Sequence, residues 1–260
     1  MSFIAPEIRD SAIARVNPVA KLIVALTVSL ALLLSIDVVS AAVALALESV
    51  LLAWSGLSAR QFWHRTLPVW VAAPLAGLTT VLYGEDSGAV IWQLGWISVT
   101  EGSLTLGLAI ALRVLAIGLP GIVLFATTDP TDLADGLGQV FRLPARFVLG
   151  GLAGLRLVGL GIQDWRSLGL ARRARGVADD GGIRRLFGQA FALLVISVRR
   201  GSKLATAMEA KGFGSSSPRT WARASRFGAA EIAVIAVGVA VAAVAIGVAV
   251  AAGSWNFVLA

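Results

Sequence analysis

Two helix endings in the second half of the sequence place a cation directly before a glycine. The first reads ARRARGV, residues 171–177, and the second reads AMEAKGFG, residues 207–214. Their cations, Arg175 and Lys211, lie 36 residues apart (211 − 175). Glycine commonly ends helices and a cation offsets the negative end of the helix dipole, so either ending alone is explained as a cap. Because the pattern occurs twice, we expect exposed helix ends that bind carboxylates, with Arg175 able to form a two-bond pair and Lys211 offering a point charge.

The composition indicates a membrane protein. Of 260 residues, 57% are hydrophobic and 14% are charged, whereas soluble domains average about 45–50% and about 25%. The absence of Cys excludes disulfides, thiolate metal sites and a Cys nucleophile. The formal net charge of +7 is explained by cytoplasmic loops that face anionic lipid and partners, so no nucleic-acid partner is expected.

Five apolar stretches are long enough to be considered for membrane spans, so we predict an all-α polytopic protein with about five transmembrane helices. The stretches are residues 22–36, 38–54, 67–83, 103–126 and 227–252. Asp37 separates the first two, and Pro68 is expected to begin the third. The predicted organisation is therefore residues 1–126 as N-terminal membrane helices, 127–226 as a cytoplasmic helical segment, and 227–260 as a C-terminal membrane helix.

The distribution of cations predicts the orientation, because Lys and Arg near span ends stay in the cytoplasm. Cations precede the first span and lie between the second and third: Arg9, Arg15, Lys21, Arg60 and Arg65. The loops at 37–40 and 84–102 contain no Lys or Arg, and the longer one carries Trp92 and Trp96 as possible interface anchors. Residues 127–226 hold 16 Lys and Arg against 7 Asp and Glu. We therefore expect a cytoplasmic N-terminus, an external C-terminus and no cleavable signal peptide.

The basic segment is predicted to be helical. Asp129, Pro130 and Asp132 are typical of a helix start, and a short helix follows to about Phe141. Two long helices are then expected over 144–175 and 183–211, each with apolar residues at three- and four-residue steps. The first also carries Gly150, Gly151, Gly154 and Gly159, whose spacing permits another helix to approach closely.

Four motifs occur in an order that resembles a known family. They are RVNPVAKL at 15–22, TTDPTDLADGL at 127–137, the ARRARG ending and AMEAKGFG. The chain is similar in these motifs to the transmembrane T component of energy-coupling factor transporters, which import vitamins and transition-metal ions in prokaryotes. The resemblance covers the cytoplasmic half, and hydropathy alone supports the first four membrane helices.

The resemblance implies a non-enzymatic scaffold in the prokaryotic plasma membrane that couples two cytosolic ABC-type ATPases to a small substrate-binding membrane subunit. It implies no cofactor or metal in this chain, with ATP and Mg on the ATPases; the sequence also lacks a G-x-x-x-x-G-K-[ST] loop. The expected ATPase-binding residues are Arg173, Ala174, Arg175 and Gly176 in one groove and Ala210, Lys211 and Gly212 in the other. The expected contacts with the substrate-binding subunit are Phe147, Gly151, Leu155, Val158, Phe191 and Leu194. Lys211 departs from the family's usual Arg, which fits a pair of unlike ATPases.

Two other functions are weighed. A membrane-embedded lipid- or phosphate-modifying enzyme would use the basic segment for phosphates and Asp129, Asp132 and Asp135 for a metal, although helix capping also explains the first two. A secondary carrier working alone is disfavoured, because no membrane half is repeated. Glu48 and Arg113 lie inside predicted spans, where ionisable groups usually pair or line a pathway, so they are a possible structural pair.

Overall fold

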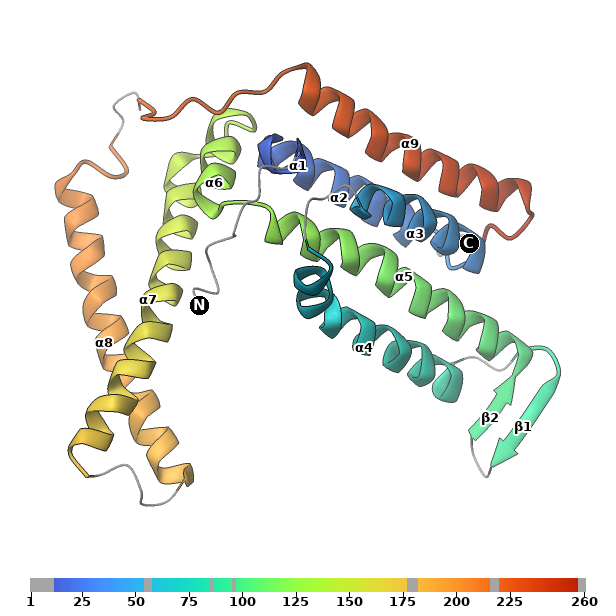
Figure 1. Cartoon of the computed structure of the whole chain (residues 1–260), viewed down its shortest axis with the longest axis horizontal. Helices are drawn as coiled ribbons and strands as arrows, with labels where there is room; N and C mark the ends of the chain where they lie inside the picture. The colour runs from blue at the N-terminus through green and yellow to red at the C-terminus, as the bar shows by residue number, and fades with distance from the viewer. Residues whose placement is uncertain are drawn as a thin grey trace. The chain divides into compact units, whose positions relative to one another are not determined.

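The computed structural model describes residues 12–53, 58–84, 87–94, 97–176, 182–215 and 220–256. In chain order the elements are α1 (Ala12–Arg15), α2 (Pro18–Leu33), α3 (Val38–Ala53), α4 (Ala59–Tyr83), β1 (Val90–Leu94), β2 (Ile97–Thr100), α5 (Glu101–Ala126), α6 (Pro130–Gln139), α7 (Ala145–Ala174), α8 (Gly182–Ala210) and α9 (Ala229–Ala251) (Figure 1). They form two compact units. The bundle unit contains α1 to α5, both strands and α9, and the helix-pair unit contains α7, α8 and the C-terminal part of α6. The all-α membrane class is thus confirmed.

Five helices of the bundle unit lie side by side (Figure 1). α5 contacts α4 on one side and α2 and α3 on the other, and α2 and α3 in turn contact α9. The core between α2, α3, α5 and α9 is made of small and medium apolar side chains: Val28, Leu32, Ala44, Ala116, Val241 and Ala245. Because many of these residues are alanine, the helix backbones approach closely, as in other membrane helix bundles.

α2 and α9 run parallel and are joined at both ends. At their starts, Asn17 Nδ2 donates to the carbonyl oxygen of Arg226 over 2.8 Å, and Asn17 N donates to Glu231 Oε1 over 3.2 Å. At their ends, the N–H of Ile36 donates to the carbonyl oxygen of Asn256 over 3.1 Å. The two starts therefore lie on one side of the bundle and the two ends on the other.

The predicted break at Asp37 is present. Its carboxylate accepts the N–H of Ser40 over 2.6 Å, which caps the start of α3, and it also accepts the hydroxyls of Ser35 and Ser40. These bonds satisfy backbone and hydroxyl groups that are buried away from water. Asp37 thus starts a separate helix instead of interrupting a longer one.

The start of α4 corrects the sequence prediction. Pro68 was expected to begin this helix, but Pro68 and Pro74 lie inside it and the helix begins at Ala59. A capping box starts it, because Ser58 Oγ accepts the N–H of Gln61 and Gln61 Oε1 accepts the N–H of Ser58, each over 3.3 Å. Pro is tolerated inside membrane helices when neighbouring helices and hydroxyl groups satisfy the freed backbone groups.

α4 and α5 meet at two glycines. A Cβ added to Gly77 would lie 2.8 Å from the carbonyl oxygen of Gly107, and one added to Gly107 would lie 2.7 Å from that of Gly77. Neither position has room for a side chain, so the two backbones are in direct contact here.

A two-stranded hairpin lies between α4 and α5, in the region expected to be a loop. β1 and β2 are antiparallel, and Trp92 pairs with Val99, Gln93 with Ser98 and Leu94 with Ile97. Trp92 is exposed. The sequence prediction contained no strands, and Trp96 lies outside the described residues.

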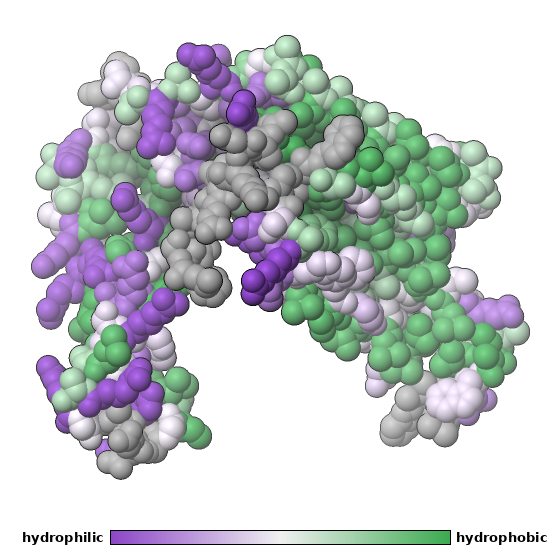
Figure 2. Space-filling view, viewed as in Figure 1, coloured by the Kyte–Doolittle hydropathy of each residue, from purple (hydrophilic) through white to green (hydrophobic). Residues whose placement is uncertain are grey.

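By length and composition, α4, α5, α7 and α9 can each cross a membrane, whereas α2 and α3 are shorter apolar helices of 16 residues. At 1.5 Å per residue, 16 residues extend about 24 Å. On the face seen in Figure 2, hydrophobic residues cover much of the bundle unit and hydrophilic ones gather on the helix-pair unit. α7 is apolar enough for a span, yet none of its most apolar window is buried within the chain.

Candidate functional site

α7 and α8 form an antiparallel pair in which both cationic endings are found. Arg200 of α8 donates from Nη1 and Nη2 to the two carboxylate oxygens of Asp164 of α7, over 2.5 and 3.3 Å. Gln189, the buried polar residue of α8, donates from Nε2 to the carbonyl oxygen of Trp165 over 2.7 Å. Because the helices run in opposite directions, the C-terminal ends of α7 and α8 lie at opposite ends of the pair (Figure 1).

The first ending is an exposed helix cap. α7 stops at Ala174, and the N–H of Gly176 donates to the carbonyl oxygen of Arg173 over 3.0 Å. Gly176 has a φ of 68°, the left-handed conformation that favours glycine after a helix end. Arg173 and Arg175 are exposed, and neither side chain forms a hydrogen bond or ion pair with a described residue.

The second ending also places a glycine in the left-handed conformation directly after a cation. The N–H of Gly212, with a φ of 77°, donates to the carbonyl oxygen of Glu209 over 2.9 Å, and the N–H of Phe213 donates to that of Met208 over 2.9 Å. These two bonds define a Schellman cap. Lys211 is exposed, and its side chain too forms no hydrogen bond or ion pair with a described residue. Both helix endings predicted from the sequence are thus present, each with a left-handed glycine after an exposed cation.

The residues expected to contact a substrate-binding subunit form exposed apolar stripes. On α7 the large side chains of Phe147, Leu155 and Val158 are 54–66% exposed, and on α8 Phe191 and Leu194 are 68% and 58% exposed. A Cβ added to Gly151 would meet nothing within 4 Å, and the same is true of Gly150 and Gly154. Within the described part of this chain, no other helix therefore packs closely against these glycines.

Two of the four sequence motifs meet at the C-terminal end of α5. Lys21 Nζ donates to the carbonyl oxygen of Thr127 over 3.0 Å, and Arg65 Nη1 donates to that of Ala126 over 3.2 Å. Two cations thus occupy the negative end of the α5 dipole. Asp132 attracts Lys21 electrostatically. In the sequence, these cations served only to predict the orientation. The position of Lys21 directly before an apolar stretch could have indicated that this lysine is buried.

α6 is tied to the chain that follows α8. Gln139 Nε2 donates to the carbonyl oxygen of Arg223 over 2.8 Å, and Gln139 Oε1 accepts the N–H of Ser225 over 2.9 Å. Trp221 packs on Gly138, where an added Cβ would lie 2.4 Å from the indole ring. These contacts were not expected from the sequence, because no local pattern marks a Gln that binds backbone 84 residues away.

No hydrogen bond or ion pair joins Glu48 and Arg113, the residues considered as a structural pair, and the buried Oε2 of Glu48 has no hydrogen-bond partner among the described residues. Asp37 is the acidic residue that attracts the guanidinium group of Arg113 electrostatically. Asp37 caps the start of α3, and Glu48 lies 11 residues after it, about 16 Å along the helix.

Comparisons with known proteins place the chain in a family. A model of the CbiQ family, described as "Cobalt transport protein", matches residues 9–221. The energy-coupling factor transporter transmembrane protein EcfT of Limosilactobacillus fermentum is 24% identical over 246 residues, which cover 88% of this chain and 92% of that protein. EcfT of Brevibacillus brevis is 28% identical over 79% of this chain and 82% of its own length, and EcfT of Streptococcus thermophilus is 31% identical over 54% and 57%.

The family match spans the bundle helices up to α5 together with α6, α7 and α8, and so includes both cationic endings. The relatives are named as transporter components and not as enzymes. From its sequence motifs, its multi-pass helical architecture and this match, the chain belongs to the CbiQ family, the transmembrane T components of energy-coupling factor transporters.

Proposed function

We propose that this chain is the energy-coupling scaffold of an importer and that it transmits ATPase motion through its two cationic helix ends. The observation that supports this best is the repeated helix ending: α7 and α8 each end in a cation followed by a glycine with positive φ, at opposite ends of one antiparallel pair. Neither Arg175 nor Lys211 is engaged by the described residues, so both charges are available to a partner.

The proposed partners at these ends are two ABC-type ATPases, which carry the ATP and Mg. One groove would hold Arg173, Ala174, Arg175 and Gly176, and the other Ala210, Lys211 and Gly212. Arg175 can bind a carboxylate with two parallel hydrogen bonds, whereas Lys211 supplies a single charge. This difference favours two unlike ATPase surfaces.

The proposed third partner is a small substrate-binding membrane subunit. The stripes of Phe147, Leu155 and Val158 on α7 and of Phe191 and Leu194 on α8 present the apolar area that such a partner would cover. The transported substrate belongs by this proposal to the vitamins or transition-metal ions, and the family description names cobalt transport.

The proposed orientation has the N-terminus in the cytoplasm and the C-terminus outside. Lys21, Arg65 and Arg226 lie on the side of the bundle where α2 and α9 start and α5 ends. A cytoplasmic location of this side agrees with the rule that cations near span ends are retained in the cytoplasm.

Co-purification tests the proposal. Wild-type chain is expressed with its transporter partners, and the ATPases that co-purify are identified by mass spectrometry. Replacing Arg175→Glu and Lys211→Glu together is expected to abolish their co-purification and substrate uptake while leaving the thermal unfolding temperature unchanged, because both side chains are exposed. A double variant that still retained the ATPases at the wild-type level would contradict the proposal.

The chain offers a matched control. Arg166 on α7 and Arg199 on α8 are exposed, lie away from the helix ends and form no ion pair with described residues. Arg166→Glu with Arg199→Glu makes the same change in net charge, so ATPase binding should persist. Loss of binding in this control would attribute the effect to overall charge and not to the helix ends.

The enzyme alternative receives little support from the geometry. Asp129 Oδ1 accepts the N–H of Thr131 over 2.6 Å, which is a capping contact, and Asp132 faces Lys21. Within the described part of the chain, no group of three His, Cys, Asp or Glu side chains is placed to hold a metal ion.

A further inference from the structure

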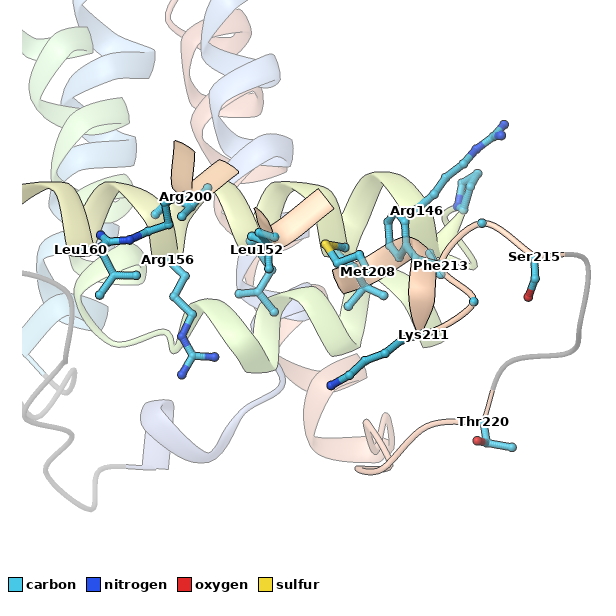
Figure 3. Close-up of a pocket in the computed structure, with 18 residues that line it drawn as sticks. Arg146, Leu152, Arg156, Leu160, Arg200, Met208, Lys211, Phe213, Ser215 and Thr220 are labelled. Atoms are coloured by element: carbon cyan, nitrogen blue, oxygen red, sulfur yellow. The ribbon is translucent and has the colours of Figure 1, made fainter. Parts of the chain in front are cut away.

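A groove opens between the N-terminal half of α7 and the C-terminal end of α8. The two helices diverge there and leave a groove of about 1090 Å³, near the upper limit of about 1,000 Å³ for small-molecule sites (Figure 3). One wall comes from residues 144–160, and the other from Arg200 to Ser215, with Thr220 at the rim.

The groove has an apolar interior. Its long side chains are mostly aliphatic and come from both helices: Leu149, Leu152, Leu157, Leu160, Leu204 and Met208. Phe213 of the second helix cap extends the same surface. A ligand in this groove would therefore bury hydrocarbon against six or seven side chains.

The charged residues of the groove are all cations. Arg146, Arg156, Arg200 and Lys211 line it, and its described lining includes no Asp or Glu. Arg200 is bound to Asp164, and Arg146 stacks over the ring of Phe147 at 5.1 Å. Figure 3 shows Arg156 and Lys211 extending to one side of the groove and Arg146 to the other. Arg156 and Lys211 make no side-chain hydrogen bond or ion pair with a described residue, so two cations remain available beside the apolar wall.

We propose that, in the chain without its ATPases, this groove binds an anionic phospholipid, with the phosphate between Arg156 and Lys211 and an acyl chain along the leucine wall. A phosphate oxygen accepts charge-assisted hydrogen bonds from both cations, and the wall provides an apolar surface for the chain. Basic pockets between helices near the cytoplasmic face are known to suit anionic lipid headgroups. α7, which forms one wall, is itself apolar and long enough to cross a membrane, and such a wall suits the acyl chain of a lipid.

Native mass spectrometry of the purified full-length chain tests this site. The chain, without ATPases, is released from mixed micelles that contain equal amounts of phosphatidylglycerol and phosphatidylcholine. Wild-type chain should retain phosphatidylglycerol preferentially, and Arg156→Gln with Lys211→Gln should reduce that preference about tenfold or more, because two charge-assisted contacts are lost. Arg156→Gln alone leaves both helix ends intact and should still weaken retention, so this result does not depend on the proposed ATPase contacts.

The control is Arg166→Gln with Arg199→Gln, which removes the same charge outside the groove and should keep the wild-type preference. An equal loss in the control, or a preference that survives in Arg156→Gln with Lys211→Gln, would overturn the site. Glycerol phosphate is added as a competitor: displacement of the lipid at equal concentration would show a site for free phosphate. A photoactivatable phosphatidylglycerol should crosslink to peptides of residues 145–160 in the isolated chain. Absence of crosslinks to these peptides in the isolated chain would also overturn the site.

Discussion

Lys21 Nζ donates to the carbonyl oxygen of Thr127 over 3.0 Å, and this hydrogen bond joins the first turn of α2 to the C-terminal end of α5. The two residues belong to sequence motifs that are more than 100 residues apart. Their contact explains why a lysine is buried at the beginning of an apolar helix: its ammonium group satisfies a carbonyl that the helix cannot pair internally.

Replacing Lys21→Met should destabilise the bundle unit. The substitution keeps side-chain length and apolar contacts but leaves the carbonyl of Thr127 with one fewer donor, which costs about 1–3 kcal/mol for a buried group. Thermal unfolding in detergent should show a lower midpoint. The exposed Lys203→Met is the control and should unfold at the wild-type temperature.

Replacing Gly77→Ala should separate α4 from α5. The new Cβ would lie 2.8 Å from the carbonyl oxygen of Gly107, and backbone atoms must shift to relieve this contact. Overpacking of this kind costs about 1–3 kcal/mol. Chemical denaturation in micelles measures the effect. Gly121→Ala, also in the bundle and with nothing within 4 Å of its added Cβ, should be neutral or slightly stabilising.

The contact between Asp164 and Arg200 should contribute a modest coupling energy. Its side chains are 22% and 37% exposed, so solvent screens the pair and we expect about 0.5–1 kcal/mol. A double-mutant cycle with Asp164→Asn and Arg200→Gln isolates the pairwise term. A cycle using Asp164→Asn and the exposed Arg199→Gln should give additive effects; equal coupling in both cycles would contradict a specific contact.

Replacing Gly176→Ala or Gly212→Ala should disturb the helix ends. Both glycines are in the left-handed conformation, which costs other residues roughly 1–2 kcal/mol. By the proposed function, ATPase co-purification should fall about fivefold to tenfold for each variant. Gly201→Ala, within α8 and with open space around the added Cβ, should bind the ATPases normally. Equal binding by all three variants would show that cap geometry does not matter to the partners.

The sequence predicted the features that are set locally. Asp37, Gly176 and Gly212 each end or begin a helix through contacts within a few residues, so the break between α2 and α3 and both cationic ends followed from local rules. The long helices α7 and α8 followed from apolar residues at three- and four-residue steps.

Features that depend on contacts between distant residues were not predicted. Local preference favours Pro68 at a helix start, yet the capping box at Ser58 extends α4 by more than two turns before it. Hydropathy predicts that Glu48 and Arg113 lie inside helices, but it does not predict whether they lie at the same depth. Their relative depth depends on how α3 and α5 align. The groove beside Lys211 likewise arises from the angle between two helices, which no spacing in the sequence encodes.

The crossing of α7 and α8 has a mechanical consequence. Arg175 lies 11 residues after Asp164 and Lys211 lies 11 residues after Arg200, so each cationic end is about 16 Å beyond the ion pair along its own helix. The two cationic ends are therefore about equally far from the ion pair, in opposite directions along the helix pair. If α7 and α8 rotated as one rigid body about the ion pair, both ends would be displaced by the same distance in opposite directions.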